Sequence, residues 1–132
     1  MKQKISIIKI GGNVIEDQES LSQFLKLFAQ LEDPKILVHG GGKRATEFGG
    51  RLGIDSKMVD GRRITDAKSL ELVVMVYAGL VNKNIVAQLQ ANNSNAIGLS
   101  GADANTVIAV KRPVNKLDFG FVGDIVDVNA GS

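Results

Sequence analysis

Residues 36–43 read ILVHGGGK, an apolar strand-like run that leads directly into three consecutive glycines. Three glycines in a row cost backbone entropy in any folded state, so a chain keeps them where it must turn sharply or let a ligand approach closely. At a strand-to-helix junction that ligand is often an anion, because free N–H groups and the helix dipole point towards it. A tight turn without any ligand is the alternative reading of this short motif.

Composition limits the classes of protein to consider. The chain has 132 residues, of which 44% are hydrophobic and 23% charged, as expected for one soluble globular domain. A net charge of +2 is no footprint for nucleic acid, and the absence of cysteine with a single histidine excludes disulfides, thiolate zinc sites and histidine-rich metal sites. The N-terminus is too polar for a signal peptide, and no apolar run approaches membrane-spanning length. We therefore expect a cytoplasmic protein with no membrane partner.

Two strand–helix pairs open the chain. An apolar run at residues 5–10 ends in a glycine pair at residues 11–12, and residues 35–38 form the next strand. One helix between them carries the apolar spacing of residues 21–31, with the acidic residues Glu16, Asp17 and Glu19 at its front. A shorter helix follows the three glycines and is predicted to end at Gly53. Strands and helices alternating at these lengths predict right-handed βαβ units and a parallel sheet.

The second half of the chain predicts a long helix and three more strands. Thr65 is the expected N-cap of a helix over residues 66–90, which is apolar on more than one side and so must be covered on two faces. Residues 96–99 predict a third buried strand. Residues 107–110 form another apolar run, and residues 119–128 alternate with period two. Together they predict a half-exposed antiparallel pair at the edge of the sheet.

Three predicted strands end in small, flexible residues, at positions 11–12, 40–42 and 100–101. The C-terminal ends of parallel strands share one edge of a sheet, and ligands bind in the crevice along that edge. Several glycine turns that converge there are a better signal than any one of them. The sequence therefore predicts an anion-binding cleft.

Two named phosphate-binding motifs can be tested against the glycines. A P-loop would need Ser or Thr where Arg44 stands. The dinucleotide fingerprint does match as Gly40-x-Gly42-x-x-Ala45, and Asp60 lies near the expected position of a ribose-binding acid. A Rossmann-type dinucleotide-binding domain is therefore an open alternative.

Phosphoryl transfer accounts for more of the charged residues. Catalysis of this reaction is mostly positioning and electrostatic stabilisation of the transferring group. Lys9, inside an otherwise apolar strand, must either reach solvent or meet an anion, and it precedes a glycine turn that faces a second one. Arg62 or Arg63, at the start of the long helix, could hold a substrate carboxylate through two hydrogen bonds, unless it is a solvated loop charge.

Six short segments carry a wider similarity. They are IKIGG at residues 8–12, VHGGG at 38–42, GRRIT at 61–65, VNK at 81–83, GLSG at 98–101 and GFVG at 120–123. In this order and spacing the chain resembles the amino-acid kinase family, and within it the N-acetylglutamate kinases of arginine biosynthesis. The resemblance implies an α/β fold, specifically a three-layer αβα sandwich with a mainly parallel central sheet and an antiparallel edge hairpin.

The resemblance also implies an enzyme and its site. It implies ATP-dependent phosphorylation, with Mg²⁺, of the γ-carboxylate of N-acetyl-L-glutamate or a related N-acyl-glutamate, giving an acyl phosphate. By the same resemblance, Lys9 would be catalytic and stabilise the phosphoryl group in transfer. Gly11 and Gly12 would donate N–H groups near the γ-phosphate, and Gly41 and Gly42 would do so on the substrate side.

Other positions follow from the same resemblance. Arg63 rather than Arg62 aligns with the family's substrate-binding arginine and would pair with the α-carboxylate. His39 looks structural, because a carboxylate nucleophile is already ionised at pH 7 and needs no general base. The helix at residues 66–90 resembles the family's dimer helix, which implies a homodimer.

The match stops before the family's second half, which holds the nucleotide base and ribose site and a second catalytic lysine. We therefore expect residues 1–132 to be a single domain that corresponds to the amino-terminal, acetylglutamate-binding and dimerisation half. By itself such a half should bind acetylglutamate weakly at best and turn over slowly or not at all. A non-catalytic dimerisation module of the same fold is a further alternative.

Overall fold

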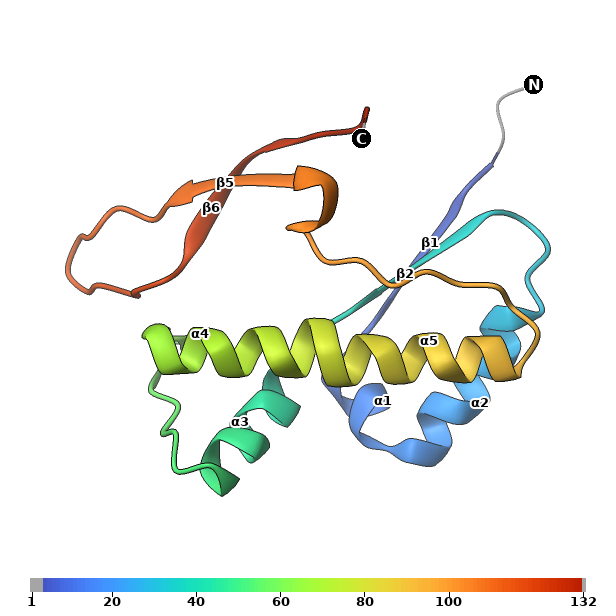
Figure 1. The fold of residues 1–132 in the computed structure, drawn as a ribbon, viewed down its shortest axis with the longest axis horizontal. Coiled ribbons are helices and arrows are strands. Elements are labelled where there is room, and N and C mark those ends of the chain that lie inside the picture. The colour runs from blue at the N-terminus through green and yellow to red at the C-terminus, as the bar shows by residue number, and fades with distance from the viewer. Residues whose placement is uncertain (1–3, 132) are drawn as a thin grey trace.

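The computed structural model describes residues 4–131 and has an α/β architecture. A continuous helical rod runs the length of the molecule, with three short helices on one side of it and a β-hairpin on the other (Figure 1). In chain order the elements are β1 (Ser6–Ile10), α1 (Gly12–Glu16), α2 (Gln18–Ala29), β2 (Lys35–His39), α3 (Gly42–Arg51), β3 (Met58–Val59), β4 (Arg62–Arg63), α4 (Ala67–Val74), η1 (Met75–Val81), α5 (Asn82–Ala91), η2 (Asp103–Asn105), β5 (Val107–Lys111) and β6 (Gly123–Val128).

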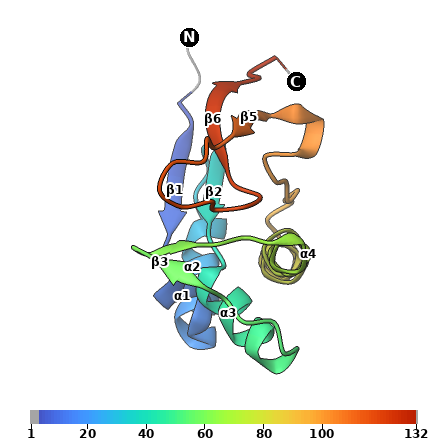
Figure 2. The ribbon, with the colours of Figure 1, turned by 90° about the vertical axis from the view of Figure 1, so that its left-hand side faces the viewer.

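β1 and β2 form the parallel pair that the strand–helix alternation predicted. Their register pairs Ser6 with Lys35 and Ile10 with His39, so the two strands end side by side. Side chains alternate between the faces of the pair: Ile10 is buried against the helices, whereas Ile7 is 69% exposed. Helices cover only one face of this pair (Figure 2). The predicted α/β fold class is confirmed.

The first predicted helix is two helices in the structure. Asp17 has an extended backbone (ψ 110°) and ends α1, and its carboxylate accepts a hydrogen bond of 2.7 Å from the amide of Ser20 at the start of α2. Asp17 is thus an N-cap rather than a residue of the helix front, and Glu16 is the last residue of α1. The physical reason is that Asp competes for backbone N–H groups and so favours caps over helix interiors.

One continuous hydrophobic core joins the helices to β1. It is built from the inner faces of α2 and the rod, with single residues of β1, α1 and α3 between them. Its buried members are Ile10, Ile15, Leu21, Leu25, Phe28, Ala45, Leu72, Val76, Val81, Ile85 and Leu89.

The rod is a single helix of three parts, α4, the π-helical η1 and α5. Its N-cap is Asp66, whose carboxylate accepts a hydrogen bond of 2.8 Å from the amide of Ser69. The prediction that Thr65 caps this helix is therefore wrong. Thr65 is instead buried and extended, and it forms a parallel β-bridge with Gly120 that ties the C-terminal hairpin to the start of the rod.

The rod has a second apolar face, as its sequence predicted. Val74 and Met75 are each 55% exposed and Leu80 is also exposed, whereas Val76 and Val81 are buried in the core. By length and composition alone, its 25 residues could cross a membrane, and 28% of the apolar window is buried. The expectation that no segment approaches membrane-spanning length is thus wrong, because two apolar faces on one helix raise its hydropathy as much as a membrane span would.

The predicted third strand is absent. Residues 96–99 have no regular secondary structure, and Ile97 and Leu99 are 83% and 59% exposed. A strand requires a hydrogen-bonded neighbour, and within residues 4–131 the β1–β2 pair does not extend to this segment. The prediction is therefore wrong, because an apolar run forms a buried strand only where a neighbouring strand can pair with it.

The structure confirms one predicted helix stop and one predicted antiparallel pair, and it corrects the position of two arginines. Gly53 has a positive φ of 68° and, with an Ile54-to-Gly49 backbone bond of 2.8 Å, completes the expected glycine stop of α3. Arg62 and Arg63 lie in β4 of a short hairpin, not at the start of a helix. β5 and β6 form the predicted antiparallel pair, but as a sheet of their own rather than as an edge of the parallel pair.

Candidate functional site

Two glycine turns leave the same edge of the parallel pair. Gly11 is the N-cap of α1 and Gly41 the N-cap of α3, and neither glycine has a side chain that could accept a hydrogen bond from the first N–H groups of its helix. The first N–H groups of a helix have no partner inside the helix. Because β1 and β2 end together, these free amides lie at one edge, as predicted for two of the three glycine turns. The third turn, at residues 100–101, follows no strand, so its predicted place at this edge is wrong.

The glycines of the two turns meet different surroundings. A Cβ added at Gly11 or Gly40 would find nothing within 4 Å, whereas at Gly41 it would lie 2.9 Å from the Tyr77 ring, and at Gly42 it would lie 3.2 Å from the Tyr77 hydroxyl. Packing within the chain thus requires Gly41 but does not require Gly11 or Gly40. The open space at the last two leaves room for a ligand to approach the backbone.

Lys9 is exposed, and its ammonium group has no hydrogen-bond or ion-pair partner within the described residues. It pairs in register with Val38 and lies two residues before Gly11. Strand alternation places its side chain with Ile7, on the face of the pair that the helices leave open. Lys9 is therefore a cation next to the first glycine turn, without a partner among residues 4–131.

Arg63 binds the start of α3. Its Nη2 donates to the Gly42 carbonyl (3.1 Å) and to Thr46 Oγ1 (2.9 Å), and its Nη1 donates to Ser56 Oγ. Three of its five N–H groups are thus occupied. Each edge of a guanidinium that can bind a carboxylate with two bonds includes an Nη2 N–H, so a bidentate carboxylate would have to displace Gly42 or Thr46.

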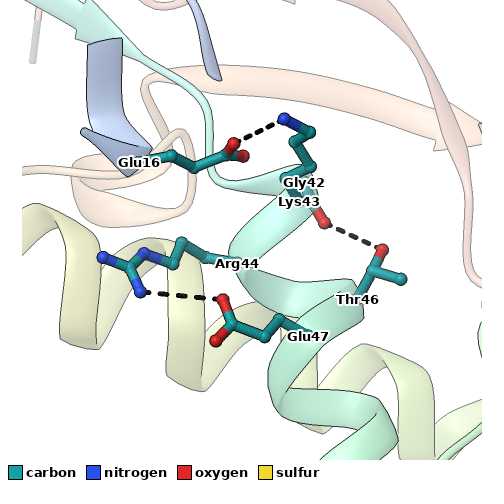
Figure 3. Close-up of polar contacts among 6 residues, drawn as sticks. All are labelled: Glu16, Gly42, Lys43, Arg44, Thr46 and Glu47. Atoms are coloured by element: carbon teal, nitrogen blue, oxygen red, sulfur yellow. Dashed lines mark hydrogen bonds and ion pairs between the residues drawn. The ribbon is translucent and has the colours of Figure 1, made fainter. Parts of the chain in front are cut away.

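An ion pair joins the helices that follow the two turns. Lys43 Nζ, at the start of α3, lies 2.6 Å from Glu16 Oε2, at the end of α1, while Thr46 donates to the Gly42 carbonyl at 3.0 Å (Figure 3). The second oxygen, Glu16 Oε1, is buried without a partner within the described residues. Sequence reasoning placed Glu16 only at a helix front and missed this link, because the two residues are far apart in the chain.

The ring of His39 is held from both sides by the chain. Its Nε2 lies 3.0 Å from Asn82 Nδ2 and its Nδ1 lies 2.9 Å from the Gly40 carbonyl oxygen. These contacts agree with the interpretation of His39 as structural. Asn82 was missed as a site residue, although a polar side chain in an apolar stretch of helix is a signal for a buried partner.

The predicted site residues fall into two groups. Gly11, Gly12, Gly41, Gly42 and Arg63 come together at the strand ends. Lys9 belongs to the same edge but reaches the uncovered face of the strands, and no contact joins it to Arg63.

Two further expectations bear on the site. Asp60, the acid of the dinucleotide alternative, lies in the turn of the β3–β4 hairpin with a positive φ of 49°, not at the end of a parallel strand. Among residues 4–131, no cluster of three or more His, Cys, Asp or Glu side chains could hold a metal ion. A carboxylate cluster for Mg²⁺ is therefore not part of the described site.

Comparison with known sequences identifies one family and relatives that share one name. Residues 4–131 match the amino acid kinase family. The chain is 60% identical over 131 residues to the acetylglutamate kinase of Phocaeicola vulgatus, covering 99% of this chain and 51% of that protein. It is 62% identical over 128 residues to the acetylglutamate kinase of Cytophaga hutchinsonii, covering 96% of this chain and 48% of that protein. The chain thus spans about half the length of the curated relatives it matches.

Solved structures are similar over almost the whole chain. The crystal structure of smu.665 from Streptococcus mutans matches with a TM-score of 0.76 at 25% identity, covering 95% of this chain and 51% of that one. An N-acetylglutamate synthase from Neisseria gonorrhoeae, complexed with coenzyme A and N-acetyl-glutamate, matches with a TM-score of 0.71 at 21% identity, covering 94% of this chain and 28% of that one. The second likeness shows the fold alone.

Proposed function

Because this chain belongs to the amino acid kinase family, we propose that it carries the substrate side of an N-acetyl-L-glutamate kinase. The reaction is phosphorylation of the γ-carboxylate by ATP, giving an acyl phosphate for arginine biosynthesis. The observation that carries the proposal is the pair of uncapped glycine turns at one strand edge, with open space at Gly11 and Gly40. The high identity to acetylglutamate kinases supports the choice of substrate.

The proposed role of each residue follows from its charge or from its hydrogen-bond donors. The free ammonium of Lys9 stabilises negative charge on the phosphoryl group in transfer, which is the largest demand of this chemistry. Amides of Gly11 and Gly12 donate to phosphate oxygens, and those of Gly41 and Gly42 to the substrate. The attacking γ-carboxylate is already ionised near neutral pH, so the site needs no general base.

Arg63 is proposed to bind the α-carboxylate of the substrate. Its Nη2 already donates to Gly42 and Thr46, so substrate would exchange one of these bonds, in which only the donor is charged, for one between two opposite charges. The exchange is favourable because a carboxylate binds the guanidinium through two parallel hydrogen bonds between ionised groups. The same bonds hold the guanidinium beside the second glycine turn before substrate arrives.

The described residues fit the phosphate end of ATP. Uncapped first-turn amides, an unpaired lysine and the open space at Gly11 suit an anionic group. ATP supplies the phosphoryl group, and Mg²⁺ neutralises part of its charge. Since Mg²⁺ usually takes phosphate oxygens and waters with only one or two carboxylates, the absence of an acidic cluster in residues 4–131 is compatible with it.

We further propose a homodimer through the exposed apolar face of the rod, in the cytoplasm. Val74 and Met75 are the exposed apolar residues of this face, each 55% exposed, whereas Val76 and Val81 pack in the core. Burying such side chains against a second copy would remove apolar surface from water. A dimer, rather than a lipid bilayer, then accounts for the hydropathy of the helix.

Ligand-dependent thermal unfolding tests the proposed substrate. At ten times its Kd, N-acetyl-L-glutamate should stabilise the chain by about 1.4 kcal/mol, which raises Tm by about 5 °C. Arg63→Met should abolish this shift, and the matched variant Arg62→Met, at the neighbouring exposed arginine, should keep it. Stabilisation by NAD alone would favour the dinucleotide alternative and refute the proposal.

Gly11→Ala tests the phosphate side separately. The new Cβ meets no atom within 4 Å, so the fold should be unaffected, with a Tm within about 2 °C of the parent. It would occupy the space through which a phosphate approaches the amides. We expect any stabilisation by MgATP to disappear, while N-acetyl-L-glutamate still binds. An unchanged MgATP effect would contradict the role of this turn.

A further inference from the structure

A polar network joins the turn after β2, the middle of the rod and the segment that follows it. Lys83 Nζ donates to Asn82 Oδ1 at 3.1 Å and to the Gly98 carbonyl at 2.8 Å. Asn82 Nδ2 contacts His39 Nε2 at 3.0 Å, and His39 Nδ1 contacts the Gly40 oxygen at 2.9 Å. The network therefore connects three segments that are far apart in the sequence.

The direction of each hydrogen bond follows from the donors. An ammonium group only donates, so the atom of Asn82 that faces Lys83 is its carbonyl oxygen, and its NH₂ group faces His39. His39 Nε2 then accepts, and the ring proton sits on Nδ1, where it donates to the Gly40 carbonyl. One lysine thus determines the tautomer of a histidine that it does not touch.

The network is built into the packing. Asn82 is only 7% exposed, and a buried amide is costly unless its hydrogen bonds are made. A Cβ at Gly98 would collide with Asn82 Oδ1 and lie 2.8 Å from Val86 Cγ2, so the close approach requires glycine there. Substituting His39 or Lys83 would leave a polar atom of the buried Asn82 side chain without its partner.

We propose that Asn82 and Lys83 are positioning residues for the second glycine turn. They hold His39 as the Nδ1–H tautomer. The bond from its Nδ1 to the Gly40 carbonyl then sets the orientation of the peptide that joins Gly40 to Gly41, and with it the directions of the Gly41 and Gly42 amides. The proposal rests on the proposed function, because those amides are the ones assigned to the substrate. Neither residue needs to touch the substrate for this role.

The tautomer can be read directly, because His39 is the only histidine of the chain. Ring ¹⁵N chemical shifts at pH 8 should report a neutral Nδ1–H tautomer in the parent chain. In Asn82→Asp a carboxylate replaces the NH₂ donor while still pairing with Lys83, so Nε2 should become protonated. Asn84→Asp adds the same charge to an exposed site on the same helix and should leave the tautomer unchanged. A parent Nε2–H tautomer, or no response to Asn82→Asp, would overturn the network.

The positioning role has its own readouts, in variants shown by circular dichroism to be folded. Without ligand, the amide ¹H–¹⁵N shifts of Gly41 and Gly42 should move in Asn82→Asp and Lys83→Met and not in Asn84→Asp. A misplacement of about 1 Å can cost about a hundredfold in reaction rate. For binding we expect a smaller effect, with N-acetyl-L-glutamate bound about tenfold more weakly by these two variants. If Asn82→Asp switches the His39 tautomer but leaves the amide shifts of Gly41 and Gly42 unchanged, the positioning role is refuted. Failure of the parent chain to bind N-acetyl-L-glutamate refutes the proposed function instead, while the amide shifts still decide the positioning.

Discussion

Alanine substitutions at Gly41 and Gly50 test the packing at the second glycine turn. Gly41 is the N-cap of α3 and Gly50 lies inside the same helix, but the two glycines meet different neighbours. A Cβ at Gly41 would lie 2.9 Å from Cδ1 and 3.2 Å from Cε1 and Cγ of Tyr77, whereas at Gly50 it would meet nothing within 4 Å. The φ of Gly41 is 174°, an extended value open to any residue, so the expected effect of Gly41→Ala is steric. The ring is part of the rod and packs against the core, so it cannot swing away freely.

The expected magnitudes have opposite signs. Overpacking of this kind costs about 1–3 kcal/mol, so Gly41→Ala should lower Tm by about 4–12 °C. Gly50→Ala, inside the helix and exposed, should raise stability by about 0.5–1 kcal/mol, because alanine loses less backbone entropy on folding. Thermal unfolding followed by circular dichroism at the helix signal measures both.

A double-mutant cycle identifies the cause. Tyr77→Ala removes the ring atoms that the new methyl group would meet, so Gly41→Ala should cost nothing in that background. The coupling between the two positions should equal most of the single-variant loss of about 1–3 kcal/mol. If Gly41→Ala leaves Tm within about 2 °C of the parent, or costs the same without the ring, the steric reasoning is refuted.

Three further outcomes are expected. Leu25 has 0% exposure in the core, so Leu25→Ala should lower the unfolding free energy in urea by about 2–5 kcal/mol. Bonds from Ser69, above all from its backbone N–H, hold the pKa of Asp66 below its usual 3.8. Its contribution is therefore present above pH 3.8 and lost as pH falls towards the lower folded pKa, and Asp66→Asn should weaken the decline measured by acid titration of Tm. A Cβ at Gly120, where φ is 75°, would collide with the Thr65 carbonyl, so Gly120→Ala should release the hairpin and speed proteolysis of its loop; an unchanged cleavage rate would contradict the bridge.

Local features of the chain were predicted well because they depend on neighbours in sequence. Apolar spacing and glycines were enough to predict β1, β2, the rod and the antiparallel pair of β5 and β6. Gly53 was correctly predicted as the stop of α3, since this stop depends only on its own φ and on backbone bonds to the last turn of the same helix. The convergence of two glycine turns followed from the parallel direction of their strands.

Errors arose where a local signal had two readings. Thr65 and Asp66 are both good caps, and only the Thr65–Gly120 bridge leaves the capping role to Asp66. Residues 96–99 have the composition of a strand, but a strand also needs a neighbour, which residues 4–131 do not offer. Apolar composition therefore could not decide between a buried strand and an exposed segment.

The sequence by itself determined the order of strands, glycine turns and helices, and which residue types line the edge where the strands end. Only the tertiary structure decided which of these groups are already engaged. Arg63 is held by Gly42 and Thr46, and His39 by Asn82, while the ammonium of Lys9 has no partner among the described residues. The physical reason is that periodicity and turn preference act over a few residues, whereas hydrogen bonds and steric contacts of side chains depend on which distant segments the fold brings within about 3 Å.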